Sequence, residues 1–128
     1  MLLRDKRSDD DMKYLPFLLL FLASCTSKPH AINHMVFIEL NDPSQATALI
    51  EDSNARLATI PTVKDYFCGT HVPAGRDTVK TDYDVGIYFA FDSLDDYKAY
   101  VKHPSHVGFV TDWKPKLQSL RVYDISGN

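Results

Sequence analysis

The sequence predicts an α+β domain of the ferredoxin-like kind, with elements in the order β-α-β-β-α-α-β. Four segments have the β-branched and aromatic composition and the two-residue alternation that are typical of strands. Three further segments begin with residues that favour helix N-termini. Their order is that of a split βαβ plan with a divided second helix, so we expect one antiparallel sheet with the helices on one face.

The segment from Ile32 to Leu40 is the first predicted strand, because it mixes β-branched and aromatic residues with a period of two. One of its faces carries His34, Val36, Ile38 and Leu40. Asp42 then suits a helix N-cap and Pro43 the first helical position, so a helix follows. We expect Pro61 to stop this helix, whose apolar stripe consists of Ala46, Leu49, Ile50 and Leu57.

Residues 63–72 form the second predicted strand, with Phe67, Gly69 and His71 on one face, and a polar loop follows. The strongest strand pattern runs from Tyr83 to Phe91. Its apolar face consists of Tyr83, Val85, Ile87, Phe89 and Phe91. Because the helices need apolar contacts of their own, we expect this strand face to meet a second sheet in a homodimer.

Ser93, with Asp96 three residues later, forms a capping box that begins the second predicted helix. Pro104 ends or bends that helix, and a further short helix follows. The candidate core residues of this region are Val107, Val110, Trp113 and Leu117. Residues 119–125 are the last predicted strand, so the folded domain is expected to span residues 32–126.

The N-terminal part of the chain has the pattern of an export signal. Lys13 precedes an apolar run from Tyr14 to Ala23, which at about 1.5 Å per residue is too short for the ~30 Å core of a bilayer. Residues 22–25, Leu-Ala-Ser-Cys, are similar to a bacterial lipobox. We therefore expect residues 1–24 to be an extension and signal peptide, Cys25 to be lipidated, and residues 25–31 to be a tether. The alternative is an ordinary secretory peptide that contains a cysteine.

This interpretation predicts a lipid-anchored protein of the bacterial cell envelope. Thr26 stands where an inner-membrane retention signal has aspartate, which favours the outer membrane. Residues 25–128 contain ten Lys and Arg against thirteen Asp and Glu, without a basic patch, so no nucleic-acid partner is expected. Beyond Cys25 only Cys68 remains, which excludes an intramolecular disulfide in the mature chain and reads most simply as a small buried side chain.

The string Y-x-x-HP-x-HV-x-F from Tyr100 to Phe109, with the flanking strand patterns, resembles the stress-responsive A/B barrel (Dabb) domains of the dimeric α+β barrel superfamily. The resemblance covers nearly all of residues 32–126. It implies a homodimer whose two sheets form a barrel, with a small cavity in each subunit. The catalytic relatives that this resemblance points to are polyketide cyclases, which close an aromatic ring. Their catalytic histidine and tyrosine fall on His106 and Tyr100, and their first-strand histidine on His34. A further cyclase histidine is replaced by Val85.

The position of His106 in the sequence is suited to a general base. It lies in the first turn of a helix that begins at Pro104, where the positive end of the helix dipole disfavours an imidazolium ion. A neutral His106 could act as a base, Tyr100 could donate a hydrogen bond to an oxyanion, and His34 could complete the cluster. The competing interpretation gives these residues structural or ligand-orienting roles. Further candidate ligand-binding residues are His71, Tyr83, Phe89 and His103.

A metal site is not expected, because Pro104 breaks the helical geometry that would align His103 and His106. The chain has no P-loop and no dinucleotide-binding glycine pattern, so no cofactor is expected. Three functions remain open. The first is binding of a small hydrophobic or aromatic molecule, the second a cofactor-free cyclase or lyase activity, and the third a structural interaction module.

Overall fold

The computed structural model describes residues 28–127 of the chain. The elements in chain order are β1 (Ile32–Leu40), η1 (Pro43–Gln45), α1 (Ala46–Arg56), β2 (Asp65–Gly69), β3 (Val85–Phe91), α2 (Leu94–Lys102), α3 (Pro104–Trp113), η2 (Lys114–Lys116) and β4 (Leu117–Ser126). The predicted order and the ferredoxin-like α+β fold are confirmed. Cys25 and the predicted signal peptide lie outside the described residues.

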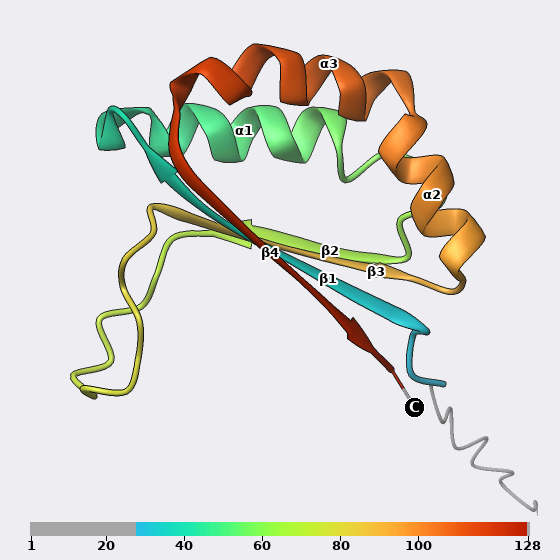
Figure 1. Cartoon of the computed structure of the whole chain (residues 1–128), viewed down its shortest axis with the longest axis horizontal. Coiled ribbons are helices and arrows are strands. Elements are labelled where there is room, and N and C mark those ends of the chain that lie inside the picture. The colour runs from blue at the N-terminus through green and yellow to red at the C-terminus, as the bar shows by residue number, and fades with distance from the viewer. Residues whose placement is uncertain (1–27, 128) are drawn as a thin grey trace, which may run out of the picture.

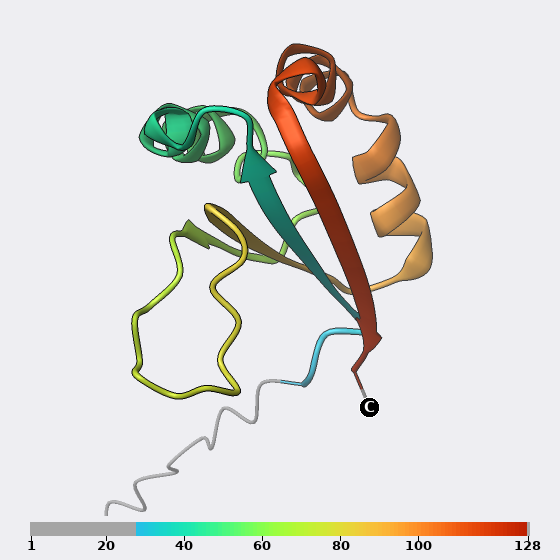
Figure 2. The same ribbon diagram turned by 60° about the vertical axis from the view of Figure 1, so that its left-hand side comes forward.

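The four strands form one antiparallel sheet in the order β2-β3-β1-β4. The helices α1, α2 and α3 all cover the same face of this sheet, and no helix of residues 28–127 lies over its other face (Figures 1 and 2). We call the helix-covered side the inner face and the opposite side the outer face. Within residues 28–127 no helix combines the length and apolar character needed to cross a bilayer.

The core lies between the inner face and the helices. It is formed mainly by aliphatic and aromatic side chains of β1 and β3 packed against α1, α2 and α3: Ile38, Leu40, Leu49, Leu57, Ile60, Val85, Ile87, Phe89, Phe91, Tyr100, Phe109 and Trp113. The even-numbered residues of β1 and the odd-numbered residues of β3 face inward, as the two-residue period requires. The alternation that identified these strands is therefore a direct consequence of this burial.

The expected origin of the dimer contact needs correction. Val85, Ile87 and Phe89 are buried beneath the helices and are not available to a second sheet. The outer face is apolar through other residues. Strand residues whose side chains point away from the helices contribute aromatic rings that contact one another there. Phe67 stacks on Tyr88 with ring centroids 5.2 Å apart, and Phe37 contacts Tyr83 and Tyr123.

Two strand boundaries differ from the sequence prediction. β2 ends at Gly69 rather than at residue 72, and β3 begins at Val85 rather than at Tyr83. Just before β3, the Asp84 carboxylate accepts a hydrogen bond from the Leu40 backbone N–H at 2.7 Å, and the Asp84 backbone N–H donates to the Ile38 carbonyl at 2.8 Å. Tyr83 then turns its ring to Phe37 on the outer face and does not extend the apolar inner face.

The helices and the last strand also differ in detail. α1 ends at Arg56, before Pro61 is reached. β4 is longer than predicted, and Leu117 starts it. Val107 and Val110 were expected in the core but are exposed, whereas Phe109 is buried, because α3 presents its 109–113 side to α1.

Candidate functional site

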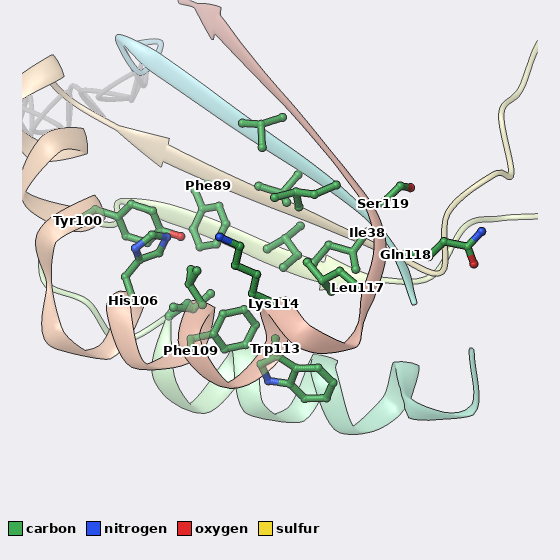
Figure 3. Close-up of a pocket in the computed structure, with 16 residues that line it drawn as sticks. Ile38, Phe89, Tyr100, His106, Phe109, Trp113, Lys114, Leu117, Gln118 and Ser119 are labelled. Atoms are coloured by element: carbon green, nitrogen blue, oxygen red, sulfur yellow. The ribbon is translucent and has the colours of Figure 1, made fainter. Parts of the chain in front are cut away.

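A cavity of about 420 Å³ lies between the inner face of the sheet and α3 (Figure 3). Its floor is formed by apolar side chains of β1, β3 and β4: Val36, Ile38, Ile87, Phe89, Leu120 and Val122. Its roof comes mostly from α3, through Phe109, Val110 and Trp113. Tyr100 and His106 close one end and are among its few polar groups, so the cavity suits a small apolar molecule with a polar end.

The joint between α2 and α3 brings Tyr100 and His106 together. His103 ends α2 and is also the N-cap of α3, where its Nδ1 accepts a hydrogen bond from the Ser105 backbone N–H at 3.2 Å. Its extended backbone, with φ −62° and ψ 137°, is the conformation favoured before a proline. The resulting bend places the Tyr100 and His106 rings 4.6 Å apart.

His106 is held as a neutral imidazole. Its Nδ1 lies 2.9 Å from the Val101 carbonyl oxygen, which can only accept, so Nδ1 carries the proton and Nε2 keeps its lone pair. Burial lowers the pKa of His106, and the nearby His34 lowers it further, while the hydrogen bond to Val101 opposes this shift. Burial is the largest of these contributions.

Tyr100 is a hydrogen-bond donor rather than a base. Its side chain is 1% exposed, and burial, followed by the neighbouring Tyr97 and Tyr66, raises the pKa of the Tyr100 phenol well above its ordinary value. The hydroxyl therefore stays protonated at physiological pH. Figure 3 shows this hydroxyl directed toward the cavity. Within residues 28–127 it makes no hydrogen bond to another side chain or to the backbone, so it is free to bind a ligand oxygen.

His34 forms a second polar cluster with Asp124 and Tyr97, next to the Tyr100–His106 pair. Its Nδ1 lies 2.5 Å from Asp124 Oδ1, and the Tyr97 hydroxyl donates to Asp124 Oδ2 at 3.1 Å. Burial raises the pKa of Tyr97 to about 12, and the hydrogen bond to the Asp124 carboxylate adds to this shift. The His34 ring centroid is 6.1 Å from that of Tyr100. The structure thus brings the three predicted residues His34, Tyr100 and His106 together.

Asp124 and Tyr97 were missed by the sequence analysis. No local motif marks Asp124, because its partner His34 is 90 residues away and is reached only through the pairing of β1 with β4. A predicted register for these two strands would have been the one available signal. Tyr97 lies one helical turn before Tyr100, and this spacing puts the two on neighbouring positions of α2.

The other candidate ligand-binding residues have different positions. Phe89 lines the cavity. His71 and Tyr83 do not, since His71 Nδ1 bonds the Tyr83 carbonyl oxygen at 3.0 Å and the Tyr83 ring lies on the outer face. His103 is occupied as the helix cap. Cys68 is partly buried beside Tyr66, and burial raises the pKa of its thiol. Among residues 28–127 no three potential metal-ligating side chains gather at one place.

A family comparison identifies the domain. The model of the stress responsive A/B barrel domain, Dabb, matches residues 32–126, which is more than half of the chain. This chain belongs to the Dabb family. Among curated proteins, none has significant sequence similarity to it.

Solved structures agree with the Dabb fold. A Dabb family protein with a ferredoxin-like fold from Mesorhizobium loti is 24% identical, with a TM-score of 0.65 over 77% of this chain and 98% of that one. A dimeric ferredoxin-like protein of unknown function from Thermobifida fusca is 23% identical, with a TM-score of 0.64 over 78% and 92%. A hydroxynitrile lyase from Passiflora edulis is 21% identical, with a TM-score of 0.66 over 78% and 95%. At these identities the similarity concerns the fold.

Proposed function

We propose that this Dabb domain binds a small hydrophobic or aromatic molecule that carries an oxygen function. The observation that carries this proposal is the cavity of about 420 Å³, apolar on its floor and roof, with Tyr100 and His106 at one end. The Tyr100 hydroxyl can donate to a ligand oxygen, and His106 Nε2 can accept from a ligand hydroxyl. The cavity volume lies in the lower part of the range for small-molecule sites, about 300–1,000 Å³.

Titration with small aromatic ketones, followed by NMR of the histidine rings and by calorimetry, tests this proposal. Saturable binding that moves the His106 resonances supports it. Val110→Phe should weaken binding, because Val110 lines the cavity, whereas Val107→Phe should not, because Val107 is an exposed residue of the same helix outside the lining. Equal effects of the two substitutions would argue against binding in this cavity.

A second candidate function is cofactor-free proton transfer next to a carbonyl group. It is favoured by the neutral state of His106, whose Nε2 could take an α-proton while the Tyr100 hydroxyl stabilises the enolate oxygen. Return of the proton from His106 would close the cycle without a cofactor, and His34 would act as a positioning residue. That a hydroxynitrile lyase shares the fold is compatible with such chemistry in this cavity.

Exchange of ketone α-protons with deuterated water, monitored by proton NMR, tests the catalytic candidate. His106→Ala should abolish exchange above the buffer rate, and Tyr100→Phe should slow it by about 10²-fold or more, the usual effect of losing one oxyanion donor. Ligand binding without exchange would support the binding function and contradict the catalytic one. A protein that neither binds nor exchanges would favour the structural interaction module.

We also propose that the domain works as a homodimer. The support is the aromatic outer face, on which the side chain of Phe67 is 65% exposed, together with the dimeric assembly stated for the Thermobifida fusca relative. Sedimentation equilibrium at micromolar concentration should give a dimer, and Phe67→Glu should shift it toward monomer by placing a charge among apolar rings. A wild-type monomer at that concentration would contradict the proposal.

Finally, we propose that Cys25 is lipidated and anchors the domain to a membrane of the cell envelope. The support is the sequence Leu-Ala-Ser-Cys after a short apolar run. Metabolic labelling with a palmitate analogue should mark the wild type but not Cys25→Ser, and membrane fractionation should place the wild type preferentially in the outer membrane. Equal labelling of the two chains would contradict this assignment.

A further inference from the structure

A line of side chains along α3 and its C-terminal end faces the cavity. His106, Val110 and Lys114 follow one another at intervals of four residues, which is close to one helical turn, and all three line the cavity. Lys114 still has helical backbone angles and caps α3, with its N–H bonded to the Val110 carbonyl. Side chains on a helix lean toward its N-terminus. Accordingly, Figure 3 shows the Lys114 side chain extending back over the cavity toward the end that holds Tyr100 and His106.

The described lining of the cavity carries positive charge without any negative charge. No Asp or Glu is among its lining residues, and His106 is neutral at physiological pH, so Lys114 supplies the one formal charge of the described lining. The Lys and Arg ion pairs found within residues 28–127 use Arg56 and Arg121 and leave Lys114 without a carboxylate partner in that part of the chain. An ammonium beside an apolar cavity is a binding group for an anion.

We propose that the ligand is an amphiphilic anion, an aromatic or aliphatic carboxylate whose apolar body fills the cavity and whose carboxylate meets Lys114. This inference rests on the proposed binding function and adds the class of ligand. The helical rise of about 1.5 Å per residue separates the backbones of His106 and Lys114 by roughly 12 Å. Because the Lys114 side chain extends toward Tyr100 and His106, a ligand that carries a carboxylate and a carbonyl or hydroxyl group can contact Lys114 and that pair at once.

Lys114 also caps the C-terminal end of α3, where the helix carries partial negative charge. Lys102 provides the matched control, because it is an exposed lysine in the last turn of α2 and does not line the cavity. Lys114→Met and Lys102→Met each remove a charge from a helix end and keep an unbranched side chain that is shorter by one heavy atom. Only the first removes a charge from the cavity.

The test compares 4-butylbenzoate with 4-butylbenzamide, which have nearly the same shape and differ in charge. The chain has a single tryptophan, Trp113, and this residue lines the cavity, so its fluorescence reports binding in the full-length protein, with calorimetry as a second readout. We expect the wild type to bind the benzoate about tenfold more tightly than the benzamide at low salt, and the preference to shrink as ionic strength rises. Lys114→Met should remove the preference without weakening the benzamide, and Lys102→Met should retain it.

Each other result has a distinct meaning. If both compounds bind with equal Kd in the wild type, or if Lys114→Met leaves the preference intact, the carboxylate inference is overturned while the cavity remains a binding site. If Lys114→Met lowers only the Tm, the ammonium serves the helix end alone and the inference is likewise overturned. If neither compound binds, while aromatic ketones do, the anion class is wrong. If none of these molecules binds, the proposed binding function itself fails.

Discussion

His34 and Asp124 lie directly opposite each other in the register of β1 and β4, and their side chains are hydrogen-bonded through Nδ1 and Oδ1. A carboxylate can only accept, so His34 donates from Nδ1 and keeps the lone pair on Nε2. His106 has the same arrangement, with a backbone carbonyl as its acceptor. Both imidazoles are therefore fixed in one tautomer by partners that lie outside the cavity lining.

Asp124→Ala should release the His34 tautomer. Nitrogen-15 shifts of the imidazole, measured at pH 8.5 where an ordinary histidine is neutral, should show a proton on Nδ1 in the wild type and a mixture of tautomers in the variant. Tyr97→Phe is the control, since it removes the other contact of Asp124 and leaves the bond to His34 in place. An unchanged tautomer in Asp124→Ala would mean that Asp124 does not orient the ring.

Tyr100→Phe should hardly change stability. The hydroxyl makes no hydrogen bond within the described chain, and the buried ring is kept, so we expect a change below about 1 kcal/mol in the free energy of unfolding. Tyr100→Ala should cost about 3–5 kcal/mol, because it leaves a cavity among Phe89, Phe91 and His34. Urea unfolding measures both values. A large loss in Tyr100→Phe would reveal a buried partner for the hydroxyl.

His106 should make stability depend on pH in a defined direction. Burial lowers its pKa in the folded state, so between that pKa and the ordinary value of about 6.5 the unfolded chain binds more protons than the folded one. Stability from this group is therefore complete above about pH 6.5 and is lost as the pH falls toward the folded-state pKa. The unfolding free energy of the wild type minus that of His106→Gln should rise from pH 5 to pH 7. A difference that falls over this range would contradict the sign.

Gly108→Ala combines two opposing effects on α3. A Cβ at this position would lie 2.6 Å from Arg56 Nη2, so Arg56 must move away from its ion pair with Asp112. That exposed pair is worth about 0–1 kcal/mol, and alanine gains about 1 kcal/mol over glycine within a helix. We expect a net change in unfolding free energy within about 1 kcal/mol. In an Arg56→Met background the clash is absent, and the same substitution should stabilise by about 1 kcal/mol.

The sequence predicted the strands of the core well because each is buried on one face only. β1 was predicted with its observed bounds, since its inward residues are apolar or form the site. β2 was predicted too long, because side chains after Gly69 continue a strand-like pattern although none of the described strands pairs with them. Alternation indicates that a residue can lie in a strand. Only pairing partners determine where the ladder ends.

The candidate site was also predictable in part from the sequence. Tyr100 and His106 lie close in sequence, and the proline between them marks the bend that brings their rings together. His34 joins them through the inward alternation of β1. Asp124 depends on a pairing between distant strands, and Lys114 depends on the orientation of α3 over the sheet. Neither relationship leaves a local pattern in the sequence.

The position of His103 between α2 and α3 affects how this site can change in evolution. As the shared end of α2 and beginning of α3, it sets the spacing of the phenol and the imidazole through a single corner of the backbone. The cavity floor, by contrast, comes from three strands that make no part of this corner. Substitutions on the floor can therefore reshape the space for a ligand while the two polar groups keep their mutual geometry. New ligand specificities are accessible by ordinary point mutation, whereas an insertion or deletion at the corner would separate the pair in one step.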